Sequence, residues 1–373
     1  MFMPDAQEYQ GAGTRRLENQ RFLQMKLIVQ IPCYNEEHTL PLVVADIPRV
    51  LEGITAVEIL VIDDGSNDRT VDVARKLGVD HILCNGANIG LAQSFKRGLD
   101  ACLRLGADII VNTDGDNQYV GSDIAKLVKP IANGEADMVI GDRQTATLDH
   151  FSLLKKCLQK LGSAIVRRLA HIDVPDTVSG FRAFSRTTAL KINILSSFSY
   201  TIETVIQAGK RNMIVLSVPV RTNPKTRDSR LFQSTPQFIQ RQVSTILRMY
   251  SMYQPLKVLF YLGTFLSIIG ILPIIRFLYF YALGNGEGHI QSLVLGGVLL
   301  LMGFLSYLFG LVADLVSFNR QLLEITLEKV RRLELNEQPR KLEEDNSRIL
   351  SNIIRLQTRE ARVSTSRKRH PHV

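Results

Sequence analysis

Short apolar runs alternate with amphipathic segments through the first part of the chain. Runs rich in Ile, Leu and Val are typical of buried strands, and the segments between them carry apolar residues at helical spacing. Strand–helix–strand order predicts a mostly parallel α/β sheet with helices on both faces. The predicted strands are residues 27–31, 58–62, 79–84, 107–111 and 138–140, and the predicted helices are residues 39–50, 70–77 and 95–105.

Polar clusters follow four of these strands where they end. Because the carboxyl ends of parallel strands meet at one edge of a sheet, and ligands bind there, we expect these clusters to converge on a site. The clusters are Tyr34-Asn35-Glu36, Asp63-Asp64, Asp114-Gly115-Asp116 and Asp142-Arg143.

The Asp-Gly-Asp cluster has the residue types of a metal site. Asp114 and Asp116 are two residues apart after a strand, so their carboxylates point to the same side. Gly115 leaves room between them, and Gln118 offers a further oxygen. Mg²⁺ and similar hard cations bridge carboxylates to substrate phosphates. The alternative is an ordinary turn after a strand.

Two long apolar stretches near the other end of the chain explain why the mean hydropathy reaches +0.05. Residues 258–275 and 293–313 carry no charge, and the first stretch resumes after Arg276. Each is long enough to cross a bilayer as a helix of about 20 residues. We predict two transmembrane helices, residues 257–283 and 291–313; the alternative is a buried helical hairpin.

Flanking charge predicts the orientation of these helices. The link 284–289 has no Lys or Arg, whereas basic residues precede the first helix and follow the second. Cytoplasmic flanks carry the excess of basic residues, so we expect the large segments in the cytoplasm of a multi-pass cell-membrane protein. The net charge of +9 then suits an anionic leaflet, and no motif supports nucleic-acid binding.

The remaining segments complete the expected organisation. Residues 1–24 are predicted to be a flexible extension, 25–232 the catalytic domain, 233–255 an amphipathic interfacial helix, 256–316 the two-helix region and 317–373 a cytoplasmic helical tail with a basic end. Pro339 is expected to interrupt that tail, through which oligomerisation is one hypothesis. Cys33, Cys84, Cys102 and Cys157 form no C-x-x-C pair, which is typical of small buried residues in a reducing compartment.

Several motifs together resemble those of family 2 glycosyltransferases of GT-A fold. They are Pro32-Cys33-Tyr34-Asn35-Glu36-Glu37, Val61-Ile62-Asp63-Asp64-Gly65-Ser66, Asp114-Gly115-Asp116-Asn117-Gln118 and Ser179-Gly180-Phe181-Arg182. More narrowly, the chain resembles the polyprenyl-phosphate glycosyltransferases, the group of dolichyl-phosphate mannose synthases and their bacterial GtrB-like relatives. One departure is Asp-Gly-Asp where many relatives have Asp-Ala-Asp.

The resemblance implies a nucleotide-sugar donor and a Mg²⁺ or Mn²⁺ cofactor. The implied metal ligands are Asp114, Asp116 and Gln118, and the implied donor-binding residues are Pro32, Tyr34, Glu36, Ile62, Asp64, Asp114, Gly115, Asp116 and Arg143. For Asp63-Asp64 the alternative is a helix-capping turn, and for Arg143 it is a solvated surface arginine.

The resemblance also implies a polyprenyl phosphate acceptor. A lipid phosphate is already anionic, so it needs positioning by cations more than a general base. Ser179 and Arg182 are implied near the acceptor phosphate, and Asp176 is either a base or a partner of Arg182. Further phosphate clamps are implied at Lys225, Arg227 and Arg230, for which attraction to the membrane surface is the alternative.

Three hypotheses about function follow. The first is an inverting transferase, with Asp176, Asp116 and Arg182 as catalytic residues, that moves a hexose from a UDP- or GDP-sugar to polyprenyl phosphate. The second is another membrane family 2 glycosyltransferase, acting on a lipid or carbohydrate hydroxyl. The third is a non-catalytic protein that binds sugar nucleotides.

Overall fold

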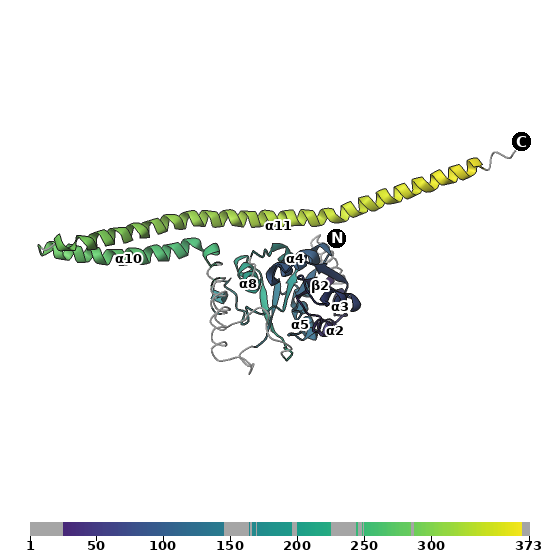
Figure 1. The fold of residues 1–373 in the computed structure, drawn as a ribbon, viewed down its shortest axis with the longest axis horizontal. Coiled ribbons are helices and arrows are strands. Elements are labelled where there is room, and N and C mark those ends of the chain that lie inside the picture. The colour runs from purple at the N-terminus through teal and green to yellow at the C-terminus, as the bar shows by residue number, and fades with distance from the viewer. Residues whose placement is uncertain are drawn as a thin grey trace, which may run out of the picture. The chain divides into compact units, whose positions relative to one another are not determined.

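A seven-stranded sheet forms the centre of the first part of the chain (Figure 1). The computed structural model describes residues 25–144, 164, 166–168, 170–195, 200–224, 244, 248, 250–284 and 287–367, with side chains as far as residue 336. The strands are β1 Met25–Cys33, β2 Ile54–Asp63, β3 His81–Cys84, β4 Ile109–Asn112, β5 Met138–Asp142, β6 Arg182–Ser185 and β7 Val215–Pro219.

The strand order is β3-β2-β1-β4-β6-β5-β7. All neighbouring pairs are parallel except those that β6 makes with β4 and β5. The mostly parallel GT-A sheet expected from the sequence is therefore confirmed. The antiparallel insertion of β6 was not predicted, because its four residues begin with a charged arginine and look like a turn.

Helices cover both faces of this sheet, as Figure 1 shows. They are α2 Leu40–Asp46, α3 Thr70–Lys76, α4 Leu91–Arg104, α5 Ile124–Ala132, α7 Arg186–Lys191 and α8 Thr201–Lys210, with a 3₁₀ turn η1 at Gly121–Asp123. On one face, α2, α3 and α5 close the main apolar core, which includes Val29, Val61 and Leu127. On the other face, Phe95 of α4 stacks on Tyr200 with ring centroids 3.8 Å apart. Each such buried side chain contributes roughly 1.5–3 kcal/mol.

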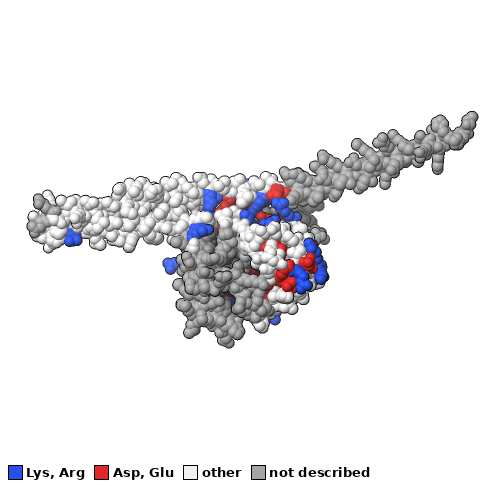
Figure 2. All heavy atoms as spheres, in the orientation of Figure 1, with Lys and Arg blue, Asp and Glu red and all other residues white. Residues whose placement is uncertain are grey.

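Two further helices, α10 Pro255–Ala282 and α11 Ile290–Arg367, are joined through the 3₁₀ turn η2 at Glu287–His289. Both are long and apolar enough to cross a membrane. In Figure 2 their paired part shows almost no charged atoms, whereas basic and acidic side chains gather over the sheet domain. Membrane association is thereby supported, and the orientation across the bilayer stays a prediction.

Glycines let α10 and α11 approach closely. A Cβ atom on Gly296 would lie 2.7 Å from the carbonyl oxygen of Gly270, and one on Gly303 would lie 2.9 Å from that of Gly263. Thr264 Oγ1 and Tyr307 OH, 3.0 Å apart, add a hydrogen bond. Helices in membranes associate through such small residues, because apolar burial drives no association within lipid.

The chain divides into two compact units, Met1–Glu324 and Ile325–Val373. Within the first, Arg211 after α8 and Glu324 of α11 form an ion pair of 2.9 Å. In the second unit α11 continues through Pro339, so the expected interruption there is wrong. A proline removes one helical hydrogen bond at a cost of about 3 kcal/mol, and the bonds on either side keep this long helix continuous.

The structure also bears on the cysteines and on two predicted segments. Cys33 and Cys102 are buried thiols, but Cys84 is exposed at the end of the edge strand β3, against expectation. The extension 1–24 lies outside the described residues, and of the predicted interfacial helix, residues 233–255, the structure describes only 244, 248 and 250–255.

Candidate active site

Several segments meet at one edge of the sheet, where β1, β2, β4, β5 and β7 end. The antiparallel strand β6 begins at this same edge, since Arg182 pairs with Asn112 of β4 and Ile140 of β5. The segment just before β6, residues 176–181, therefore lies at the same edge as the polar clusters that follow the parallel strands. The convergence expected from the strand ends is present, and β6 adds the predicted acceptor segment to it.

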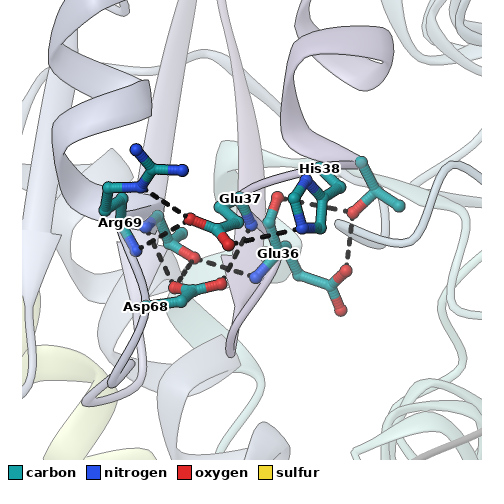
Figure 3. A network of polar contacts seen from close by, with 7 residues as sticks. Glu36, Glu37, His38, Asp68 and Arg69 are labelled. Carbon is teal, nitrogen blue, oxygen red and sulfur yellow. Dashed lines mark hydrogen bonds and ion pairs between the residues drawn. The ribbon is translucent and has the colours of Figure 1, made fainter.

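The loops after β1 and β2 are tied together by the polar network in Figure 3. The backbone N–H of Glu37 donates to Asp68 (3.1 Å), and Arg69 Nε donates to the Glu37 carboxylate (3.1 Å). The backbone N–H of Glu36 donates to Thr70 Oγ1 (2.8 Å). Glu36, 5% exposed, is held at the edge of the site by these contacts.

The carboxylate of Asp64 is occupied by hydrogen bonds from the loop after β3 and the start of α4. Its carboxylate accepts hydrogen bonds from Asn85 Nδ2 and from the backbone N–H groups of Ile89 and Gly90, at 2.9–3.0 Å. The side chain thereby fixes the loop after β3 beside the site. Its contact with the donor nucleotide stays a prediction.

Three other predicted donor-site residues lie along the same edge. Pro32 is buried, and its carbonyl oxygen would lie 3.2 Å from a Cβ atom on Gly115, so this glycine allows the loop after β4 to contact the end of β1. Tyr34 is half-buried just after β1. Ile62 turns its side chain onto Gly98 of α4, so a contact of Ile62 with the donor would have to come from its backbone.

Asp114 and Asp116 lie on one short loop after β4. Burial, followed by repulsion from Asp116, raises the pKa of Asp114 to about 7. Asp116 accepts the backbone N–H of Gln118 at 3.1 Å, which turns the loop back on itself. A divalent cation between the carboxylates would relieve their repulsion, so this donor set fits Mg²⁺ or Mn²⁺.

The described residues contain no group of three or more His, Cys, Asp or Glu side chains able to hold a metal by themselves. The pair of carboxylates would need Gln118 and substrate phosphate oxygens to complete a coordination shell.

Arg143 and Asp176 form a bidentate ion pair across the site. Arg143 Nε and Nη2 donate to the two carboxylate oxygens of Asp176 at 2.7 and 3.0 Å, and the two side chains are only 12% and 2% exposed. Burial alone would raise the pKa of Asp176, but the Arg143 guanidinium outweighs it and holds the pKa below its ordinary value. Asp176 therefore pairs with Arg143 and not with Arg182, the partner considered from the sequence.

Arg182 is wholly buried, and its guanidinium is directed at protein oxygens. It donates to the carbonyls of Ser179, Thr201 and Thr177, each at 2.7 Å, and to Thr204 Oγ1. Burial lowers its pKa to about 10. In this arrangement Arg182 joins the segment before β6 to the first turn of α8; its role as an acceptor ligand stays a prediction.

The other predicted acceptor residues differ in how far the structure describes them. Ser179 is fully buried in the segment that Arg182 holds. Lys225, Arg227 and Arg230 lie outside the described residues.

A buried polar network beside the loop that carries Asp114 and Asp116 was not predicted from the sequence. Asn112 Nδ2 donates to Tyr200 OH (2.8 Å) and to the Gly180 carbonyl (3.0 Å), and Asn112 Oδ1 accepts from Gln30. Tyr119 OH accepts the backbone N–H of Gly180 at 3.0 Å. The available signal was the presence of polar Gln30 and Asn112 inside otherwise apolar strands, because buried polar groups need partners.

Comparison with known proteins identifies the class. Residues 28–192 match the model of the glycosyl transferase family 2. An N-acetylglucosaminyltransferase of Methanococcus voltae, named for UDP-N-acetylglucosamine and dolichyl phosphate, is 32% identical over 214 residues, which cover 52% of this chain and 83% of its own. The chain belongs to glycosyl transferase family 2 and is a glycosyltransferase.

Other relatives extend the comparison. The polyprenol monophosphomannose synthase of Mycolicibacterium smegmatis is 29% identical over 52% of this chain and 76% of its own. The glycosyltransferase AglJ of Haloferax volcanii is 28% identical over 78% of this chain and 93% of its own. Among solved structures, glucosyl-3-phosphoglycerate synthase from Mycobacterium tuberculosis is similar with a TM-score of 0.48 and 19% identity, over 60% of this chain and 80% of that one.

Proposed function

We propose that this chain transfers a hexose, with inversion, from a UDP- or GDP-sugar to the phosphate of a polyprenyl phosphate. The relatives from Mycolicibacterium smegmatis and Methanococcus voltae are named for polyprenol and dolichyl-phosphate products or substrates. The two apolar helices next to the catalytic domain are suited to a lipid acceptor. These similarities favour a lipid-linked product over a soluble one.

The observation that carries the proposal is the ion pair between Arg143 and Asp176. Both oxygens of the candidate base are engaged by an arginine, and its pKa is lowered. A hydroxyl acceptor needs a general base, whereas a phosphate acceptor already carries its nucleophilic oxygen. The site is therefore better suited to a phosphate.

In the proposed reaction a phosphate oxygen of the acceptor attacks C1 of the sugar, and the bond from C1 to the donor diphosphate breaks. The electron pair leaves with the nucleoside diphosphate, whose charge must be stabilised. A cation held by Asp114, Asp116 and Gln118 would supply much of that stabilisation. Arg143, whose charge acts on Asp114, would add charge-assisted hydrogen bonds to phosphate oxygens.

The test compares polyprenyl phosphate with free polyprenol, using purified full-length protein, a panel of UDP- and GDP-sugars, and Mg²⁺ or Mn²⁺. We expect an acid-labile glycolipid and free nucleoside diphosphate only with the phosphate acceptor, and loss of both in EDTA. Asp116→Asn should abolish transfer, while Asp72→Asn on the exposed surface of α3 serves as the control. Equal transfer to both acceptors would favour the hydroxyl-acceptor hypothesis instead.

A further inference from the structure

The metal loop, residues 114–120, is hydrogen-bonded to the segment that follows β7. This leaving segment, residues 220–223, runs antiparallel to the end of the metal loop and forms a bridge between Thr222 and Tyr119. The backbone N–H of Val120 donates to the Arg221 carbonyl (3.3 Å), and that of Asn223 donates to the Gln118 carbonyl (2.9 Å). Two segments about a hundred residues apart in sequence thus share a short ladder.

The side chain of Asn223 reinforces this ladder at the most unusual point of the loop. Asn117 has a left-handed backbone with φ of 59°, a conformation that needs local support in a residue with a Cβ atom. Asn223 Nδ2 donates to the carbonyl oxygen of Asn117 at 3.1 Å, to its Oδ1 at 3.3 Å and to the carbonyl oxygen of Tyr119 at 3.4 Å. One half-buried amide therefore binds the residues on either side of Gln118. It bonds Asn117, which lies between the predicted metal ligands Asp116 and Gln118, and it bonds Tyr119, which follows Gln118.

An ion pair between buried Asp123 and the exposed side chain of Arg221 fixes the other end of the ladder. Asp123 is fully buried at the end of η1, and it accepts the backbone N–H of Arg221 at 2.7 Å and Nη2 of the same residue at 2.8 Å. Lys126 reaches the same carboxylate at 3.0 Å. Burial opposes ionisation, but these donors outweigh it and lower the pKa of Asp123 to about 2, so the pair is charged at neutral pH.

The same leaving segment also contacts the opposite wall of the site. The backbone N–H of Val220 donates to the Asp142 carbonyl at 2.9 Å, next to Arg143. Residues 220–223 therefore connect the metal loop to the strand end that carries Arg143.

We infer that Asn223 and Arg221 are positioning residues for the metal loop, which hold Asp116 and Gln118 in the geometry that a divalent cation requires. Asn223 acts through residues 117 and 119 of the loop itself. Arg221 acts through Asp123, just after the loop, which its side chain holds. This inference rests on the proposed use of a metal at Asp114, Asp116 and Gln118. Partners behind metal ligands typically contribute 10–100-fold to metal affinity.

The test measures Mn²⁺ binding directly, by titrating Mn²⁺ into full-length protein in detergent with UDP or GDP present to supply phosphate oxygens. The free ion is followed by electron paramagnetic resonance, against the same titration without protein. Asn223→Ala should weaken binding by about 10–100-fold, and Arg221→Ala should weaken it in the same direction. Asn133→Ala is the matched control, because Asn133 is exposed after α5, away from the loop in sequence, and its amide donates to Glu135 at 2.9 Å. Its Mn²⁺ affinity should equal that of the wild type.

A second readout separates positioning from damage to the fold. Amide hydrogen exchange of residues 117–121 should accelerate in Asn223→Ala and stay unchanged in Asn133→Ala. In transfer assays the apparent KM for Mn²⁺ should rise, the KM for polyprenyl phosphate should hold, and excess Mn²⁺ should restore turnover. If Asn223→Ala does not fold, Asn223→Asp keeps the shape and backbone N–H but loses the donor.

Wild-type Mn²⁺ affinity in these variants would overturn the inference, and so would a wild-type protein that binds no Mn²⁺. Absence of glycolipid from a protein that still shows the expected Mn²⁺ differences would count against the proposed acceptor alone, and would leave the positioning role standing.

Discussion

Asp176 and Arg143 illustrate how a pair of charged residues takes a different role from either residue alone. The folded-state pKa of Asp176 is lowered. Its ion pair therefore contributes stability that is present above the ordinary aspartate pKa of about 3.9 and is lost as pH falls through the lower folded value. Between pH 5 and 9 Asp176 stays ionised, so we expect no change in transfer rate over that window to come from its titration.

A double-mutant cycle tests this pairing. Arg143→Lys keeps the charge but loses the bidentate fork, and Asp176→Asn keeps the shape but loses the charge. We expect each change to lower kcat/KM by about 10–100-fold, since residues in direct contact couple by up to about 3 kcal/mol. The double variant should lose far less than the product of the single losses. Effects that simply multiply would show that the two side chains act independently.

The sequence predicted which residue types gather at one edge of the sheet, but it did not predict their hydrogen-bond partners. Strand ends and residue types predicted that Asp114 and Asp116 lie at one edge of the sheet with Arg143, and the family resemblance added Asp176 to them. The sequence cannot show that Arg182 meets backbone carbonyls of Thr201 and Thr177, because any residue can present a carbonyl. Partners of that kind are set only by tertiary structure.

At the scale of elements, the long apolar patterns were the dependable ones. β1, β2 and β4 coincide with Ile- and Val-rich runs. The two apolar helices begin within two residues of the predicted starts at 257 and 291, although α11 continues to Arg367. β6 was missed because it has four residues, one of them a buried arginine whose partners come from elsewhere. The predicted break at Pro339 failed because a local preference of one residue was outweighed by the cooperativity of a 78-residue helix.

The pairing of α10 with α11 makes a prediction that two adjacent glycines can test. A Cβ atom on Gly296 would lie 2.4 Å from Ile274 Cγ1 and 2.7 Å from the Gly270 carbonyl, whereas one on Gly297 would meet no atom within 4 Å. Gly296→Leu should therefore separate the helices and lower the thermal stability of the detergent-solubilised protein by several degrees. Gly297→Leu adds the same side chain to the same helix and should change stability little. Equal effects of both would mean that this contact does not hold the hairpin together.

At the scale of the whole molecule, the distribution of basic residues bears on orientation. Lys257 lies in the first turn of α10, and Arg320, Lys329 and Arg331 follow the apolar part of α11, while the link 284–289 has neither Lys nor Arg. Only about 20 residues of a helix are needed to cross the apolar part of a bilayer. Most of α11 therefore extends beyond the span that residues 291–313 would make. Because cytoplasmic flanks carry the excess of Lys and Arg, we expect this extension to lie in the cytoplasm.

Reporter fusions test the orientation in the cell. A phosphatase that is active only outside the cytoplasm and a fluorescent protein that folds only inside it would each be joined after Gly286 and after Val373. We expect phosphatase activity at Gly286 alone and fluorescence at Val373 alone, because two spans return the chain to the side on which it began. Matching signals at both positions would show that one helix does not cross. Moving the charge bias supplies the control: two lysines inserted into the link should weaken the phosphatase signal, because basic residues resist transfer out of the cytoplasm, whereas two serines at the same place should leave it unchanged.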